Sequence, residues 1–149
     1  MGFKSSRPEQ ELKKGPDNLW AIGNGEYIVI ECKSGTITDS IDKRDCNQLS
    51  GSKNWFEAEY NDSAFSCTPL MIHNSNIFDY SCSPSKDVRI MTPSFLKSLK
   101  QTIQKFLVAL AQNDNWRDEN KVNELITTYK LRSNDIIREY SSTDKIKSI

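Results

Sequence analysis

The sequence predicts an α/β fold, with a mixed β-sheet of about four to five strands flanked by helices and followed by a C-terminal helical pair or triplet. Three observations support this class: an apolar strand pattern over 27–33, a helical pattern over 41–60, and helical spacing of apolar residues within 92–141. At 149 residues the chain fits one domain. We expect its core within about 5–75 and a helical part within about 92–141.

The first strands are predicted to form a hairpin. Asp17 to Ile22 has the pattern of a short strand, and Gly23-Asn24-Gly25 follows it as a turn signal before the next apolar run. A three-residue loop pairs Ile22 with Glu26, and counting back along both strands then places Asp17 opposite Glu31. The sequence therefore predicts two carboxylates that face each other across the hairpin.

The remaining elements follow from periodicity, capping residues and turn signals. In chain order they are an extended first segment over 5–9 in which Pro8 disfavours a helix, the helix over 41–60, strands over 68–73 and 88–91, and helices that start at Thr92-Pro93, span 116–131, and run from a cap at Asn134 through Tyr140. The tail after Ser141 is expected to fray.

Two charged residues, Glu31 and Lys33, end the apolar strand. Side chains two residues apart share one face of a strand, so these two emerge together while Cys32 turns to the other face. Burying such charges costs several kcal/mol unless they are paired or bind something. The opposed carboxylates of Asp17 and Glu31 would also repel each other unless a cation lies between them. The pattern therefore indicates a metal-dependent site that cleaves phosphodiesters.

Composition narrows the class of function. Lysine and arginine together number 20, as do aspartate and glutamate, so any positive charge that meets nucleic acid is local or comes from a companion domain. The 4 cysteines form no Cys-x-x-Cys pair and there is 1 histidine, which argues against a zinc site and a disulfide framework. No apolar run reaches the ~20 residues of a membrane span, and we expect a cytoplasmic protein.

The spacing of the charged residues resembles a known signature. Pro16-Asp17, thirteen intervening residues and Glu31-Cys32-Lys33 resemble the motif of the PD-(D/E)xK nuclease superfamily, the fold of restriction endonucleases and Holliday-junction resolvases. Four further segments look like a nuclease-like domain at the end of some bacterial helicase-type defence proteins: Arg7-Pro8-Glu9, Gly15-Pro16-Asp17-Asn18-Leu19-Trp20, Lys43-Arg44-Asp45 and Gln48-Leu49-Ser50-Gly51-Ser52.

The resemblance implies a restriction-endonuclease-like mixed sheet with Asp17 and Glu31 on adjacent strands, and a helix that carries Gln48 beside the site. The superfamily core normally opens with a helix before the first strand, whereas this chain begins near the expected first strand. We therefore expect either a fragment of a longer protein or C-terminal helices that cover the exposed face of the sheet.

The chemistry gives each motif residue a role. Mg²⁺ or Mn²⁺ would be held by Asp17, Glu31 and the backbone carbonyl of Cys32, because hard cations take oxygen ligands and keep several waters. Lys33 would orient the attacking water or stabilise transition-state charge. Gln48 would hold the water or a phosphate oxygen.

Other residues have less specific roles. Glu9 is left open between an additional metal ligand and a solvated edge residue. His73 is expected to be a hydrogen-bonding group at a strand end, and the Cys32 side chain to pack in the core rather than to act as a reactive thiol. Phosphates of DNA are expected to meet three basic residues of the helix predicted over 41–60: Lys43, Arg44 and Lys53.

The predicted function is metal-dependent hydrolysis of DNA, with endonuclease action favoured, inside a defence or repair system. Its expected partners are DNA and a helicase or other companion domain or subunit, and a homodimer is left open. The alternative is a catalytically inactive module of the same fold that binds DNA or a protein. A third hypothesis, a docking domain unrelated to nucleic acid that uses the C-terminal helices, leaves the cluster of Asp17, Glu31 and Lys33 unexplained.

Overall fold

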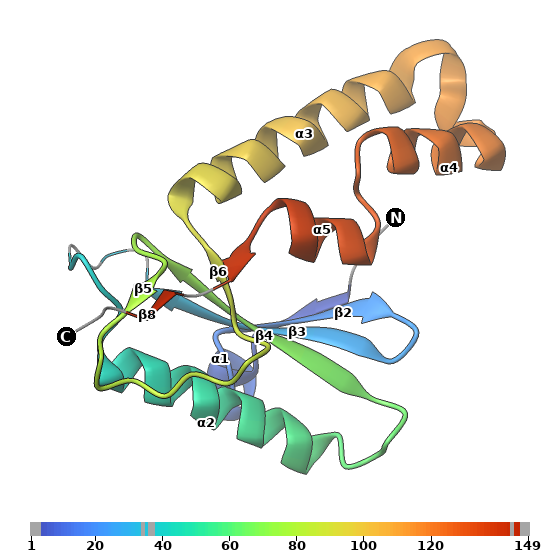
Figure 1. The fold of residues 1–149 in the computed structure, drawn as a ribbon. Coiled ribbons are helices and arrows are strands. Elements are labelled where there is room, and N and C mark those ends of the chain that lie inside the picture. The colour runs from blue at the N-terminus through green and yellow to red at the C-terminus, as the bar shows by residue number, and fades with distance from the viewer. Residues whose placement is uncertain (1–3, 34, 36–37, 144, 147–149) are drawn as a thin grey trace. The chain divides into compact units, whose positions relative to one another are not determined.

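The computed structural model describes residues 4–33, 35, 38–143 and 145–146 (Figure 1). The chain divides into two compact units, one formed by Met1–Pro93 with Ser142–Ile149 and the other by Ser94–Ser141. Within the described part of the chain, no helix has the length and apolar character needed to cross a membrane.

The first unit is built on a mixed six-stranded sheet with the order β1-β2-β3-β4-β6-β7. Its strands are β1 (Lys4–Ser6), β2 (Asn18–Gly23), β3 (Glu26–Lys33), β4 (Ser66–His73), β6 (Arg89–Met91) and β7 (Ser142–Thr143). The pairs β1/β2, β2/β3 and β6/β7 are antiparallel, whereas β3/β4 and β4/β6 are parallel. Two short strands, β5 (Ile77–Phe78) and β8 (Lys145–Ile146), pair separately. The α/β class and the mixed sheet are thus confirmed, with more strands than predicted.

The β2/β3 hairpin closes through a two-residue turn rather than the predicted three-residue loop. Asn24 (φ 53°) and Gly25 (φ 76°) both have positive φ, as a type I′ turn requires, and Gly23 pairs with Glu26. The predicted pairing of Ile22 with Glu26 is therefore wrong. An irregularity between Ala21 and Gly23 takes up the extra residue.

Beyond that irregularity the hairpin has the predicted register. Leu19 pairs with Val29 and Asn18 with Ile30, so one further step places Asp17 opposite Glu31. The register survives the wrong loop length because a bulge shifts the pairing by one residue, which compensates for the shorter turn.

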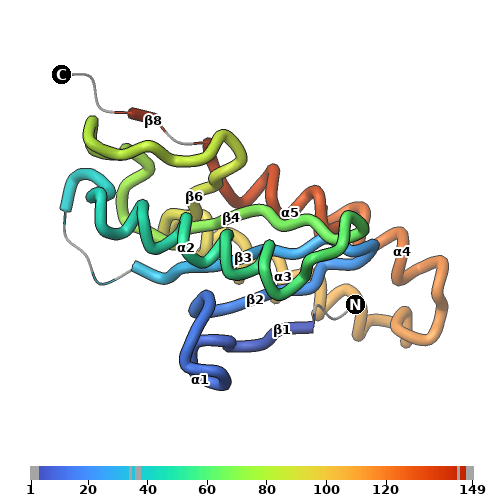
Figure 2. Tube along the Cα trace, turned by 90° about the horizontal axis from the view of Figure 1, so that it is seen from below, coloured from blue at the N-terminus to red at the C-terminus, as the bar shows by residue number. Residues whose placement is uncertain are grey.

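Helix α2 (Lys43–Glu59) packs against β3 and β4 and runs along them (Figure 2). Asp42 caps its first turn by accepting a hydrogen bond from the Asp45 backbone N–H at 2.8 Å. Its apolar face buries Leu49 and Phe56 against the sheet. The helix predicted over 41–60 is confirmed to within two residues at its start and one at its end.

The N-terminal segment differs from the prediction. Residues Pro8–Leu12 form a short helix, α1, instead of an extended segment. Pro8 occupies the first helical turn, where its missing N–H costs nothing, and is buried. The Arg7 backbone N–H donates to Oε1 of Glu11 at 3.0 Å. Proline here starts a helix rather than preventing one.

The second unit is helical. It contains α3 (Pro93–Ala111), a 3₁₀ segment (Gln112–Arg117), α4 (Glu119–Thr128) and α5 (Ser133–Glu139). The predicted start at Thr92-Pro93 is confirmed. The helix predicted over 116–131 is shorter, because Asp118 caps α4 by accepting from the N–H groups of Asn120 and Lys121.

Two further predictions near the C-terminus are wrong. Asn134 does not cap α5, whose N-cap position is Arg132. The tail after Ser141 is not frayed where the structure describes it, because Ser142 and Thr143 pair with β6. Local sequence could not show this pairing, since it depends on a strand about fifty residues earlier in the chain.

Candidate active site

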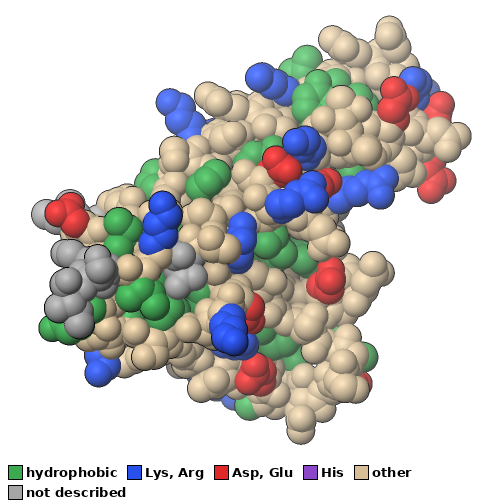
Figure 3. Space-filling view, in the orientation of Figure 1, with side chains coloured by type: hydrophobic (Ala, Val, Ile, Leu, Met, Phe, Trp, Pro, Cys, Tyr) green, Lys and Arg blue, Asp and Glu red, His purple; other side chains and the backbone are tan. Residues whose placement is uncertain are grey.

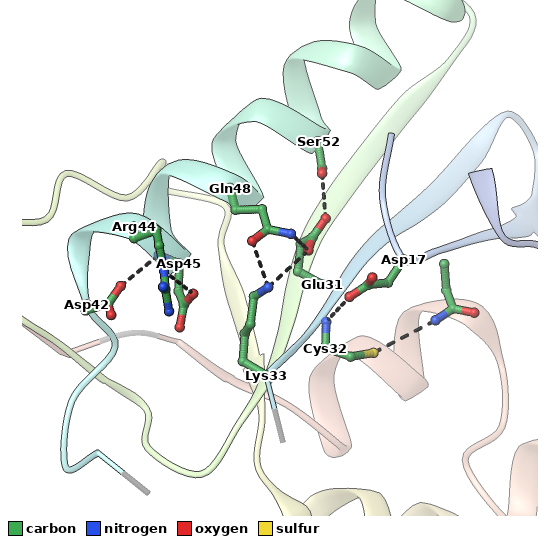
Figure 4. Close-up of polar contacts among 10 residues, drawn as sticks. Asp17, Glu31, Cys32, Lys33, Asp42, Arg44, Asp45, Gln48 and Ser52 are labelled. Atoms are coloured by element: carbon green, nitrogen blue, oxygen red, sulfur yellow. Dashed lines mark hydrogen bonds and ion pairs between the residues drawn. The ribbon is translucent and has the colours of Figure 1, made fainter. Parts of the chain in front are cut away.

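The centre of the site is Glu31, the sixth residue of β3, which is fully buried. Two side chains of α2 donate hydrogen bonds to its carboxylate (Figure 4): Ser52 Oγ to Oε1 at 2.6 Å and Gln48 Nε2 to Oε2 at 2.8 Å. Ser52 lies one helical turn after Gln48, so both reach the same carboxylate. The helix thereby fixes where each oxygen of Glu31 points.

Lys33 joins the same network from the end of β3. Its Nζ donates to Gln48 Oε1 at 2.7 Å and lies 3.9 Å from Glu31 Oε2. The two ends of the Gln48 amide are therefore assigned by their partners, with nitrogen toward the carboxylate and oxygen toward the ammonium. The predicted meeting of Glu31, Lys33 and Gln48 is present in the structure.

Asp17 is the residue that precedes β2, and it reaches the site from there. Its Oδ2 accepts a hydrogen bond from the Cys32 backbone N–H at 2.7 Å, which ties the start of β2 to the end of β3 (Figure 4). Its charge also contributes to raising the pKa of Glu31, so the two carboxylates lie within electrostatic range of each other. The hairpin register and this contact agree with the predicted pairing of Asp17 with Glu31.

Several opposing effects act on the protonation of Glu31. Burial raises its pKa most, the hydrogen bond from Ser52 lowers it, the charge of Asp17 raises it, and the Lys33 ammonium lowers it. The net effect is a pKa above the ordinary value of 4.5. A cation beside the carboxylates would favour the charged form and oppose this rise.

Glu9 is a third carboxyl group near the strand end, although it lies on α1 rather than on the predicted strand. A hydrogen bond with the Asp17 carboxyl group and the charge of Asp17 raise the pKa of Glu9. The side chain is exposed, as the alternative of a solvated residue predicts, whereas its role as an additional metal ligand stays a prediction. It is a solvated residue that lies within reach of Asp17.

Cys32 contributes its backbone rather than its side chain. It is exposed, and its Sγ accepts a long contact from Asn18 Nδ2 at 3.9 Å, so the predicted core packing of this side chain is wrong. Partial burial and the nearby carboxylates raise the pKa of the thiol, which disfavours a reactive thiolate.

The donor set has the chemistry of a hard-cation site. Carboxylates of Asp17 and Glu31 with the Cys32 carbonyl supply the oxygen atoms that Mg²⁺ prefers. An ionised carboxylate has about four acceptor positions, so the two hydrogen bonds to Glu31 leave capacity for a cation. Among the described residues no group of three or more His, Cys, Asp or Glu side chains forms a ready-made metal site. A cation would therefore depend on backbone and water oxygens as well.

The three predicted phosphate-binding residues are not gathered in one place. Lys43 and Arg44 lie in the first turn of α2 and are exposed, and Arg44 Nε is 3.7 Å from Asp45 Oδ1. Lys53 instead forms an ion pair with Asp87 at 2.9 Å and lines a separate pocket. Its charge is thus already matched by a carboxylate.

His73 ends β4, next to Lys33 in the parallel register. It is fully buried, and its Nδ1 accepts a hydrogen bond from the Ser75 backbone N–H at 2.9 Å. The prediction of a strand-end hydrogen-bonding group is confirmed. Burial leaves it no direct access to a substrate.

The sequence pattern gives Ser52 no role, yet this residue makes the shorter of the two hydrogen bonds that α2 donates to Glu31. The available signal was its spacing of four residues from Gln48, which places both on one helical face. That spacing alone does not show which helical face meets the strand.

No protein-family model matches the sequence, and comparisons with curated proteins and with solved structures found no match.

Proposed function

We propose that this protein hydrolyses phosphodiester bonds of DNA with Mg²⁺ or Mn²⁺, in a restriction-endonuclease-like fold. The observation that carries the proposal is the network at the end of β3, in which Gln48 bridges the buried Glu31 carboxylate and the Lys33 ammonium. Asp17 lies beside this network, because it accepts a hydrogen bond from the backbone N–H of Cys32, the residue between Glu31 and Lys33. Burying the Glu31 carboxylate costs stability, and groups whose pKa is perturbed in this way cluster at functional sites.

The roles of the residues follow from their contacts. When bound, the cation would supply Lewis acidity, lower the pKa of a water molecule and neutralise the leaving oxygen. Asp17, Glu31 and the Cys32 carbonyl would hold it. The Lys33 side chain is 19% exposed, so its ammonium can reach a phosphate or the attacking water. Gln48 accepts a hydrogen bond from this ammonium and thereby keeps it beside the carboxylate.

The charge distribution supports action within a larger assembly. Basic and acidic side chains are interspersed on the face shown in Figure 3, in agreement with a formal net charge of zero. A strong free-standing grip on DNA needs several unpaired cations near the phosphates. We therefore propose a domain or subunit of a defence or repair system, in the cytoplasm, with a helicase or similar companion that supplies DNA affinity.

A cleavage assay tests the proposal. Circular and linear DNA are incubated with the purified protein in Mg²⁺, Mn²⁺ or chelator, beside variants Asp17→Asn and Lys33→Ala. Lys121→Ala in α4 is the matched control, because it removes an exposed lysine that pairs only locally with Glu124. Metal-dependent nicking by the wild type and Lys121→Ala, lost in the other two variants, is the expected result. Equal cleavage by all four proteins would refute the assignment.

The second candidate is a catalytically inactive module of the same fold that binds DNA or a partner protein. Its supporting observation is that Glu31 is fully buried and both of its oxygens already accept hydrogen bonds within the protein. Such a carboxylate can serve to lock α2 onto β3. Salt-dependent DNA binding by the wild type, without cleavage in either metal, would favour this candidate.

A further inference from the structure

One face of α2 carries four residues at spacings of four, three and four: Gln48, Ser52, Trp55 and Glu59. Such spacing places them along a single stripe of the helix. The first two hold Glu31, as described above. The other two contact the segment that precedes Asp17.

Trp55 packs directly against the backbone of Gly15. A Cβ atom at Gly15 would lie 2.8 Å from Cδ2 and Cε2 of the indole, closer than real side chains approach. Gly15 also has φ of +89°, in the region that glycine adopts without strain. Beside it, Lys14 forms an ion pair with Glu59. The ring and the ion pair together attach this loop to the helix.

The attached loop leads straight to the site. Pro16 follows Gly15 and is buried, and its carbonyl oxygen accepts from the Glu9 backbone N–H at 3.2 Å. Asp17 comes next and accepts from the Cys32 backbone N–H. Because Pro16 has a fixed φ and is buried, little freedom remains between the ring contact and the Asp17 carboxylate.

We infer that Trp55 is a positioning residue for Asp17, and that one stripe of α2 thereby sets the separation of the two carboxylates. Ser52 and Gln48 place Glu31 directly, whereas Trp55 places Asp17 through Gly15. The catalytic part of this inference rests on the proposed nuclease function. The positional part stands on the packing alone.

The contact depends on the flat ring rather than on its polar atom. In the described part of the chain, Nε1 of Trp55 is buried without a hydrogen-bond partner. Trp55→Phe therefore keeps an aromatic surface under Gly15 and removes no hydrogen bond from the indole, whereas Trp55→Leu removes the flat surface. The conservative variant should rescue what the second one loses.

Amide hydrogen exchange at Cys32 reports the position of Asp17 without any need for cleavage, because the Cys32 N–H donates to the Asp17 carboxylate. We expect Trp55→Leu to lower the protection of this amide at least tenfold relative to the mid-strand amide of Met71 in β4, which lies in a different core cluster from Phe56. Trp55→Phe should stay within about threefold of the wild type. Asp17→Ala removes this hydrogen bond altogether and sets the lower limit of protection.

Phe56→Leu is the matched control. Phe56 is the next residue of α2 and is buried against Leu19 and Val29, so its truncation destabilises the same helix without touching Gly15. It should lower the protection of both reporter amides alike. Unchanged Cys32 protection in folded Trp55→Leu, or an equal loss in Phe56→Leu, would overturn the inference.

Gly15→Ala perturbs the contact from the other side and covers the case in which Trp55→Leu fails to fold. The added methyl meets the indole, so Cys32 protection should fall. The additional fall that Gly15→Ala causes should be smaller in a Trp55→Phe background, because the phenyl ring is smaller than the indole. Additive effects of the two changes would refute the coupling between these residues.

The activity arm tests the catalytic part separately. Misplacing a reacting group by about 1 Å can cost ~10²-fold in rate, so Trp55→Leu should lower metal-dependent cleavage at least tenfold at unchanged DNA affinity. Trp55→Phe should restore it. If the wild type does not cleave, the nuclease proposal fails while the exchange data still decide the positional inference.

Discussion

Replacing Glu31 by glutamine separates the structural cost of this carboxylate from its use. Glutamine keeps the shape but has one acceptor oxygen and one NH₂ donor group. Ser52 can still donate to the oxygen, whereas the new NH₂ faces Nε2 of Gln48, which cannot accept. One hydrogen bond to a charged acceptor is lost, worth about 1.5–3 kcal/mol. In return, the substitution removes a buried charge.

The pH dependence of stability distinguishes these two effects. The pKa of Glu31 is raised above its ordinary value of 4.5, chiefly by burial. The folded protein thus holds this proton more tightly than the unfolded chain, and the free energy of unfolding falls as pH rises from 4.5 through the folded pKa. Glutamine has no such penalty. The free energy of unfolding of the wild type should therefore exceed that of the variant most below about pH 4.5, and the difference should shrink as pH rises above that value.

Urea unfolding at several pH values measures this difference in free energy. Glu139→Gln is the control for the direction of the pH dependence. The Arg138 guanidinium and the Lys130 ammonium lower the pKa of Glu139, so the contribution of this carboxylate to the free energy of unfolding grows as pH rises. A difference between wild type and Glu31→Gln that stays constant or widens with rising pH would refute the burial argument.

Metal adds a second arm to the same experiment. A cation that binds only the folded state stabilises it by about 1.4 kcal/mol at a concentration tenfold above Kd. Mg²⁺ should stabilise the wild type at about pH 8 and leave Glu31→Gln unchanged. The variant should also lose at least a hundredfold in cleavage while DNA binding is kept or tightened, because the removal of negative charge reduces repulsion of phosphate. Equal Mg²⁺ stabilisation of both proteins would place the cation elsewhere.

Three further variants test neighbouring parts of the site. Lys33→Ala should lose cleavage as Glu31→Gln does. It should also weaken DNA binding slightly, because it removes a positive charge near phosphate. The two variants should therefore change DNA affinity, measured by fluorescence anisotropy, in opposite directions. Ser52→Ala removes the hydrogen bond that lowers the pKa of Glu31, so the acidic limb of the pH–rate profile should move to higher pH. The free energy of unfolding should fall by about 1–2 kcal/mol. An acidic limb that does not move would contradict this prediction. Replacing Lys43 and Arg44 by glutamine should reduce the slope of log K against log salt by about 0.9 for each phosphate that is no longer neutralised, and an unchanged slope would exclude both from the DNA interface.

The part of the site that lies on the β2/β3 hairpin could be predicted because the signals there are local. An apolar run, the turn signal Gly23-Asn24-Gly25 and the period of a strand were enough to bring Asp17 and Glu31 to neighbouring positions. The loop length was wrong, yet the register held, because strand pairing is also constrained by which side chains must be buried.

The partners that come from other elements were harder to predict. The resemblance to the nuclease superfamily implied Gln48, but Ser52 as the second donor to Glu31 depends on the rotation of α2 about its own axis over the sheet. The sequence pattern places Glu9 on a strand because Pro8 disfavours a helix interior, whereas proline at the first helical position is compatible with a helix. Both errors concern features that local periodicity does not encode.

The positions of the basic residues bear on how the proposed enzyme would hold DNA. Lys53 donates to both carboxylate oxygens of Asp87, at 2.9 and 3.2 Å. Although burial opposes both charged forms, this hydrogen bond leaves the pKa of Lys53 raised and that of Asp87 lowered. Moving Lys53 to a phosphate would break its ion pair with Asp87, so the exchange gains only the difference between the two contacts.

The basic charge that remains exposed on α2 lies in its first turn, at Lys43 and Arg44, close to the helical turn that carries Gln48. Two such side chains can orient a DNA strand at the site but supply only a small part of the binding free energy, because the electrostatic contribution scales with the number of phosphates neutralised. In the proposed enzyme, tight binding of DNA would therefore come from surfaces outside this cluster. Because the net charge of the chain is zero, we propose that a companion subunit supplies those surfaces.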